Sequence, residues 1–144
     1  MYSFFPVFAY NLQSLYPSES IRIGHLSSLA DADLSNNGLC ISVYKNEETK
    51  TIQDQGYESQ YRLKVDFDYS IAIISNVSEA AANEVATTVL GLIRPGIDVI
   101  VAAYDGSAYS MYISKINDKV EYNSDIAAWV QTLNFVGSTF LKEI

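Results

Sequence analysis

The stretch that decides the fold is Tyr61-Arg-Leu-Lys-Val-Asp-Phe-Asp-Tyr-Ser-Ile-Ala-Ile73. Large apolar side chains occupy every second position from Tyr61 to Ile73, and mostly charged or hydroxyl side chains lie between them. A period of two residues is typical of a β-strand, because successive side chains point to opposite faces of a sheet. The stretch therefore predicts a long strand with one buried face and one charged face.

A helix is predicted directly after this strand. Ser78 is a favourable N-cap residue, and Glu79 lies in the first turn, where the helix dipole stabilises a negative charge. Arg94-Pro95-Gly96 ends the pattern. We expect a helix from Ser78 to about Ile93, and its apolar stripe consists of Val85, Val89, Leu92 and Ile93.

Upstream of the long strand, the sequence predicts one short helix and two strands. Apolar residues recur at helical spacing from Phe5 to Leu15, with Pro6 in the first turn, although an extended conformation is also compatible with this stretch. Residues 21–24 predict a brief strand. Residues 39–44 predict another strand, which follows a turn-forming segment at 31–38.

The C-terminal third is predicted to be β-structure. Residues 97–104 are apolar, 109–116 form a strand, Asn117-Asp118 form a turn and 119–122 form a returning strand. Residues 129–141 predict a final strand, and residues 124–128 are also compatible with a helical turn. The sequence as a whole predicts a single α+β domain over residues 1–144. Its mostly antiparallel sheet carries one main helix packed on it and a short N-terminal helix.

Residues 45–60 are polar and charged, and Ile52 and Tyr57 are the apolar exceptions. This composition predicts a long exposed loop or a projecting hairpin. Such a segment often orders on a partner, sometimes by adding a strand to the partner's sheet. A hairpin without any binding role is an equally good interpretation of the same residues.

Composition limits the classes of function. The chain has 144 residues, and its nine Lys and Arg against seventeen Asp and Glu give a net charge of −8. This charge argues against a surface that binds nucleic acid. One Cys excludes an intramolecular disulfide and a multi-cysteine zinc site, and one His makes a histidine-based catalytic centre a poor hypothesis. The eleven Tyr, six Phe and one Trp are more aromatic residues than a small core obviously needs.

The candidate metal and phosphate sites each lack a residue that the binding chemistry requires. Asp33-x-Ser35-x-Asn37-Gly38 reproduces the first half of an EF-hand loop, but Tyr44 occupies the position of the bidentate glutamate. An Asx-rich turn before a strand explains the string better. Residues 91–96 have the glycine spacing of a phosphate-binding loop without its Lys and Ser or Thr, which is the pattern of a helix end.

Candidate catalytic groups fail in the same way. Cys40 lies among apolar strand residues, and His25 is the only available base, so a buried thiol and a surface histidine are the better interpretation. Asp66 and Asp68 share a strand face with basic neighbours, which favours a solvated or ion-paired face over acid/base catalysis. We therefore predict that the protein is not an enzyme and has no metal or cofactor.

The apolar N-terminus predicts neither a secretory signal nor a membrane anchor. No Lys or Arg precedes Arg22, and no apolar stretch approaches the length of a membrane span. We expect a soluble protein made in the cytoplasm.

The layout resembles the tail-terminator or cap proteins of phage tails and of extracellular contractile injection systems. The resemblance covers roughly residues 5–100. It consists of the N-terminal helix, the Ile21-Arg-Ile-Gly24 strand, Gly38-Leu-Cys-Ile-Ser-Val-Tyr-Lys-Asn46, the charged loop, Leu63-Lys-Val-Asp-Phe-Asp-Tyr69, and a helix ending in Leu90-Gly-Leu-Ile93.

The resemblance implies a structural protein without catalysis. Members of this family form a ring, commonly a hexamer, that ends the tail tube and in contractile tails also engages the sheath. It implies assembly in the bacterial cytoplasm, then a place in the particle, with other copies and with tube and sheath proteins as partners. The alternatives are a neck, tail-completion or baseplate adaptor protein, or a ligand-binding domain or enzyme with an unrecognised site. The candidate interface residues are Lys45, Asn46, Glu47, Glu48, Lys50, Asp54, Tyr57, Glu58, Asp66, Asp68 and Trp129.

Overall fold

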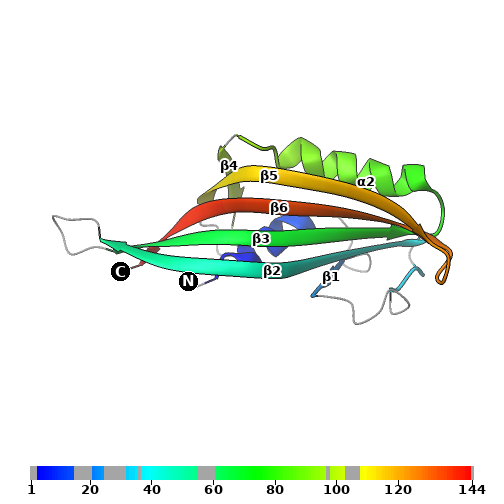
Figure 1. The fold of residues 1–144 in the computed structure, drawn as a ribbon, viewed down its shortest axis with the longest axis horizontal. Coiled ribbons are helices and arrows are strands. Elements are labelled where there is room, and N and C mark those ends of the chain that lie inside the picture. The colour runs from blue at the N-terminus through cyan, green and yellow to red at the C-terminus, as the bar shows by residue number, and fades with distance from the viewer. Residues whose placement is uncertain are drawn as a thin grey trace.

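The computed structural model describes residues 3–14, 21–24, 32–35, 37–54, 61–96, 98–102 and 108–143. Within these residues six strands form one sheet, in the order β1-β2-β3-β6-β5-β4 (Figure 1). The pairing of β1 with β2 is parallel, and every other described pairing is antiparallel. The strands are β1 Ile21–Ile23, β2 Leu39–Asp54, β3 Tyr61–Ser75, β4 Asp98–Ala102, β5 Ala108–Asn123 and β6 Ala128–Glu143.

Two helices in the described residues, α1 (Phe5–Gln13) and α2 (Glu79–Leu92), pack on the same face of the sheet. We call it the helix face, and the opposite face the open face. Both helices contribute to one apolar core with alternate residues of β3. The α+β class, the short N-terminal helix and the main helix packed on a mostly antiparallel sheet are confirmed. The β3 core residues are Leu63, Val65, Phe67, Tyr69, Ile71 and Ile73.

The residues of β3 that lie between these core positions point to the open face. Lys64, Asp66 and Asp68 are partly exposed there. Farther along the strand, Ile74 is buried in a second, small apolar cluster. This cluster contains Cys40, Ala128 and Val130, and Ala32, Leu34 and Ile126 pack against it. The open face is thus apolar and covered at one end of the sheet and polar at the other.

The structure of α2 follows its local sequence. Its N-cap is Ser78, whose hydroxyl oxygen accepts a hydrogen bond from the Ala81 N–H at 3.1 Å. Glu79 lies in the first turn, and the helix ends at Leu92. The predicted cap and both predicted ends are therefore confirmed to within a residue.

The strand predicted at 39–44 is wrong in length, because β2 continues to Asp54. Residues 45–54 pair in antiparallel register with residues 61–69 of β3, so the hairpin interpretation of this segment is correct and the loop interpretation is not. The strand pattern is hidden by a bulge at Asn46, and by the polar residues Lys45, Glu48 and Lys50 on the helix face.

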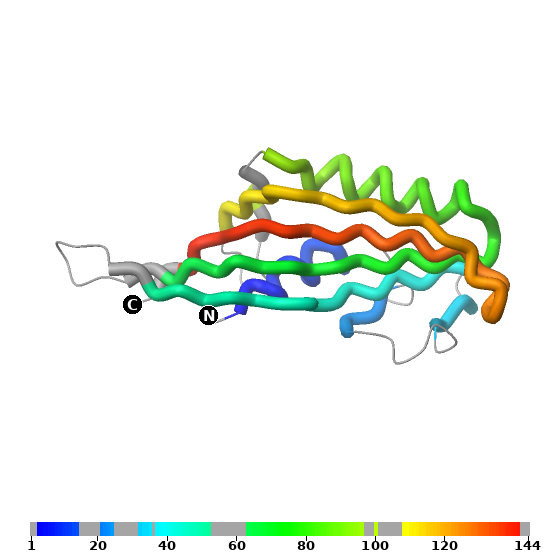
Figure 2. The backbone as a smooth tube through the Cα atoms, viewed as in Figure 1, coloured from blue at the N-terminus to red at the C-terminus, as the bar shows by residue number. Residues whose placement is uncertain are grey.

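The turn predicted at Asn117-Asp118 is also wrong. β5 runs without a reversal from Ala108 to Asn123, and Asn117 pairs with Asn134 in its middle (Figure 2). The chain reverses at residues 124–127 instead, where the Asn123 Oδ1 accepts hydrogen bonds from the Asp125 and Ile126 N–H groups. Asn and Asp occur inside β5 because most of its side chains from Tyr112 onward are exposed.

Candidate interaction surface

The predicted interface residues of the 45–60 segment lie on a hairpin of β2 and β3. Figure 1 shows that this end of the sheet extends beyond α1, toward the side where the C-terminus lies. Asp54 is the last residue of β2 and pairs with Tyr61. Tyr57 and Glu58 lie outside the described residues. The bulge at Asn46 decides how the side chains before Asp54 are distributed between the two faces.

Asn46 is the extra residue of the bulge, and its amide joins a polar network on the open face. The amide nitrogen donates to the Asp68 Oδ1 at 3.0 Å and to the Ser70 Oγ at 2.6 Å. Asn134 of β6 donates to the same two groups. Asp68 is therefore held by amides from β2 and β6, which fixes its carboxylate between the two neighbouring strands.

The bulge also sends two consecutive glutamates to opposite faces. Glu47 pairs with Asp68 and is exposed on the open face, whereas Glu48 pairs with Phe67 and points to the helix face. The side chain of Glu48 is 1% exposed and lies 3.2 Å from the Lys50 Nζ. It therefore stabilises the interior and leaves Glu47 as the exposed carboxylate of the pair.

Glu48 fixes the N-terminal segment to the sheet. Its carboxylate accepts hydrogen bonds from the Ser3 hydroxyl at 2.9 Å, the Phe5 N–H at 3.2 Å and the Tyr69 hydroxyl. Burial raises the pKa of Glu48, but the hydrogen bonds from Tyr69, Ser3 and Lys50 and the Lys50 charge outweigh it, so the pKa lies below its ordinary value. Burial and the Glu48 carboxylate raise the pKa of Tyr69, which keeps its hydroxyl a donor.

A groove runs along the open face beside the hairpin, with a volume of about 420 Å³. Three carboxylates line one side of it, and one of them, Asp66, lies 3.6 Å from the Lys64 Nζ. The sequence-based expectation of an ion-paired strand face is correct for Asp66. The groove residues are Glu47, Thr49, Asp66, Phe67, Asp68, Tyr112, Ser114, Val136, Gly137 and Ser138.

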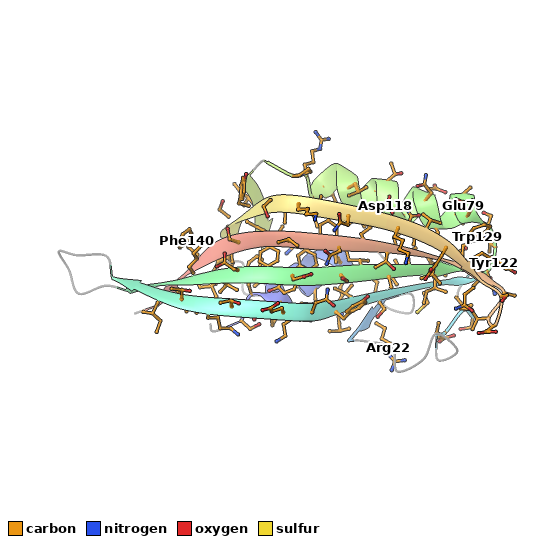
Figure 3. The ribbon with its side chains drawn as sticks, viewed as in Figure 1. Arg22, Glu79, Asp118, Tyr122, Trp129 and Phe140 are labelled. Carbon is orange, nitrogen blue, oxygen red and sulfur yellow. The ribbon has the colours of Figure 1, made fainter. Side chains whose placement is uncertain are left out.

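Trp129 lies at the opposite end of the sheet from the hairpin. It pairs with Ser75 of β3 and Tyr122 of β5, and its ring meets the Tyr122 ring edge-on at 5.0 Å. Figure 3 shows Tyr122 and Trp129 together at this end and Phe140 at the other. The structure therefore does not bring Trp129 together with the predicted residues of the hairpin.

The sequence did not reveal that β5 carries exposed side chains on both faces. Tyr112, Lys115 and Lys119 are exposed on the open face, and Val120 and Tyr122 are exposed on the helix face. The false turn at Asn117-Asp118 divided this strand into two short pieces. The alternation of Ile116, Asp118, Val120 and Tyr122 on one face would have indicated a continuous strand.

The structure supports the non-catalytic, non-metal interpretations of the EF-hand-like string and of Cys40. The Asp33 carboxylate accepts a hydrogen bond from the Ser35 N–H at 3.0 Å, as in an Asx turn. Cys40 is buried, and burial raises its thiol pKa. Among the residues with described positions, no three His, Cys, Asp or Glu side chains gather as metal ligands would. His25 lies outside them.

None of the helices that the structure describes is long and apolar enough to cross a membrane. No protein-family model matches the chain, and no curated protein matches it. Among solved structures, the chain is similar to one described as "Virion of native gene transfer agent (GTA) particle", with a TM-score of 0.47 and 10% sequence identity. The similarity covers 94% of this chain and 92% of that chain, and at this level it assigns no function.

Proposed function

We propose that this protein is a structural component of a phage-tail-like particle, namely a ring-forming terminator or cap that ends the tail tube, the sheath or both. The observation that carries the proposal is the order of elements from α1 to α2. A short helix, a brief strand, a long hairpin and a self-capped helix follow one another as in the family that the sequence resembles. The proposal treats residues 1–144 as one domain of this kind, without catalysis or cofactor.

The hairpin supports this role because it extends from the domain and carries charged, partly exposed groups. Lys45, Glu47 and Asp66 present such groups along it, while Glu48 anchors α1. In the proposed particle the exposed groups face a neighbouring ring, and Trp129 belongs to a second contact at the far end of the sheet. The contacts of the ten candidate residues other than Glu48 with tube or sheath are part of this proposal, whereas Glu48 is buried against the N-terminal segment.

The ring is proposed to close head to tail, with six copies as the expected number. Such a ring uses two different patches on each subunit. A neck, tail-completion or baseplate adaptor protein would form the same kind of head-to-tail ring at another position in the particle. In each case the protein is made in the bacterial cytoplasm and then becomes part of the particle.

Light scattering during size-exclusion chromatography, with negative-stain imaging, tests the proposal. The expected result is a closed ring of the full chain, formed alone or on added tube protein. A protein that remains monomeric in the presence of tube protein contradicts the proposal.

Substitutions on the open face test the hairpin separately. A deletion of the hairpin would remove Glu48 and detach α1, so docking is better tested with Glu47→Lys and Asp66→Lys in one chain. We expect this variant to remain folded and to bind tube or sheath protein at least tenfold more weakly, because two exposed charges are reversed. Glu121→Lys, an exposed reversal away from the hairpin, is the matched control.

A further inference from the structure

The outer edge of β5 has no pairing partner over most of its length among the residues that the structure describes. β4 pairs only with residues 108–112, and the Gly96 N–H donates to the Ile113 carbonyl at 2.8 Å. Beyond this point, over residues 114–123, no described strand pairs with β5 on that side, where Figure 1 shows it as the outermost long strand. Such an edge is a template for another strand, and natural proteins usually keep it short or cover it.

The helix face of β5 is uncovered along the same stretch. α2 packs on β3 and β6. Asp118, Val120 and Tyr122 point to the helix face and are nevertheless exposed. The exposed fraction is 38% for Val120 and 52% for Tyr122. Two neighbouring apolar side chains beside open backbone groups favour contact with another protein surface.

One observed hydrogen bond shows which residues direct their backbone groups outward. The Ile113 carbonyl points outward to Gly96, and Ile113 lies on the helix face. Residues on one face of a strand direct their N–H and C=O groups to the same side. Asp118, Val120 and Tyr122 therefore direct theirs outward, where an added antiparallel strand would pair with them.

The β5 strand of a second copy can pair with this edge through a two-fold axis, but most registers bring like charges together. Cross-strand neighbours point to the same face, so a two-fold pairing of β5 with its own copy is centred on one residue. A centre at Asp118, Lys119 or Glu121 places that charge opposite its own copy. A centre at Asn117 places Lys115 of each copy opposite Lys119 of the other. Like charges directly opposite each other are destabilising.

A centre at Val120 is the register that pairs opposite charges. It places Val120 opposite its own copy and Lys119 of each copy opposite Glu121 of the other. These open-face pairs occupy non-hydrogen-bonded positions, where the side chains lie closest. Within one copy Lys119 and Glu121 already lie 3.7 Å apart, so the four side chains alternate in sign around the axis. Centres at Ile116 or Tyr122 pair shorter stretches and bring no opposite charges together.

We propose that the partner of the open β5 edge is a second copy of this chain, with residues 117–123 of the two copies pairing antiparallel about a two-fold axis at Val120. The two sheets then form one continuous sheet. The paired stretch begins after Ile113, so β4 and Gly96 keep their places on both copies. The contact goes beyond the proposed ring, because a two-fold contact joins the same patch of two chains and is separate from a head-to-tail contact.

Charge exchange tests the register in the purified full chain. Lys119→Glu alone and Glu121→Lys alone each place like charges opposite each other, so each should weaken dimerisation about tenfold. The double variant should restore dimerisation, because the ion pairs are reversed rather than lost. Glu84→Lys, an exposed reversal on α2, should leave dimerisation unchanged. Sedimentation equilibrium measures all four variants, and failure of the double variant to recover overturns the register.

A single cysteine tests the position of the axis. In the proposed register the two Val120 residues form a hydrogen-bonded pair with a Cα–Cα distance of about 5.5 Å, which a disulfide can span. Val120→Cys should therefore give a linked dimer on mild oxidation. Tyr112→Cys, in the part of β5 that pairs with β4, should not. The wild-type chain, whose Cys40 is buried, controls for background. Equal linkage of the two variants, or none from Val120→Cys, overturns the pairing.

The outcomes separate this contact from the proposed function. Glu121→Lys should lose dimerisation and keep its binding to tube protein, because the hairpin lies at the other end of the sheet. A wild-type chain that is monomeric alone but forms rings on tube protein overturns the two-fold pairing and leaves the ring-forming role intact. Linked Val120→Cys dimers of a chain that never forms rings support the pairing and contradict the terminator role. Linkage of Val120→Cys to added tube protein in place of its own copy assigns the edge to that protein and overturns the pairing.

Discussion

The two helices lie on the same face of the sheet, yet they are held there in different ways. α2 has 14 residues, and its own Ser78 caps its first turn. α1 has 9 residues, and its N-cap residue, Phe4, makes no side-chain cap hydrogen bond. The Phe5 N–H instead donates to Glu48, a residue of β2 that lies far away in the sequence.

This difference shows that α1 is stabilised mainly by tertiary contacts, and less by its own local sequence. A helix this short is marginal in isolation. Its side chains contribute to an aromatic cluster, in which the Phe8 ring lies 5.0 Å from the Tyr69 ring and 5.8 Å from the Phe135 ring. The helix α1 therefore depends on the sheet. Substitutions that weaken the contacts between α1 and the sheet should affect α1 while leaving α2 in place.

Phe8→Ala should have the largest effect. Phe8 is 1% exposed and is surrounded by Phe67, Tyr69 and Phe135. We expect a loss of about 4 kcal/mol in the free energy of unfolding, because burial of the ring is lost and a cavity remains. Urea denaturation measures the loss. Gln13→Ala, an exposed change in the same helix, should cost less than about 0.5 kcal/mol, and equal losses would contradict the packing argument.

Glu48→Ala should have the next largest effect and should distinguish the two helices most clearly. It leaves the Phe5 N–H and the Tyr69 hydroxyl buried without their acceptor and Lys50 without its anion. We expect a loss of about 3 kcal/mol. Hydrogen exchange should accelerate in α1 and remain slow in α2.

Glu47→Ala is the matched control for this variant, because it removes the neighbouring carboxylate from the open face. We expect a change within about 0.5 kcal/mol. Equal costs for the two alanine variants would show that the bulge does not separate their roles.

The stability that Glu48 provides should depend on pH. Its pKa is lowered in the folded protein, so its contribution is fully present above the ordinary glutamate pKa of about 4.3 and is lost as the pH falls through the lowered folded value. The difference in unfolding free energy between the wild type and Glu48→Gln should therefore be constant near neutral pH and shrink in acid. A difference that grows in acid would reverse the inferred sign.

The sequence predicted those parts of the fold whose signals are local. The period of two from Tyr61 to Ile73 is confirmed as β3, and Ser78 is confirmed as the cap of α2. The length of β2 was missed because the Asn46 bulge breaks the alternation. β5 was divided at Asn117-Asp118 because its exposed side chains tolerate turn-forming residues in mid-strand.

The candidate surface was less predictable for a different reason. Charge alone cannot tell Glu47 from Glu48, and only the register of β2 against β3 shows which carboxylate is buried. Similarly, only the pairing of β5 with β6 shows that Lys115 and Lys119 lie on the open face and Val120 on the other. These relations depend on pairings between distant strands, which no local pattern in the sequence contains.

Ser78→Ala should have the smallest effect apart from the two control variants, and it completes the comparison from the side of α2. The variant leaves the Ala81 N–H without its capping oxygen, and loss of such a cap typically costs about 1 kcal/mol. Ser78→Asp should retain most of that stability, because a carboxylate accepts the same hydrogen bond and favours the positive end of the helix dipole. Since this cap is local, hydrogen exchange should accelerate only in the first turn of α2 and remain unchanged in α1. An effect that spreads to α1 would show that the two helices are coupled through the core they share.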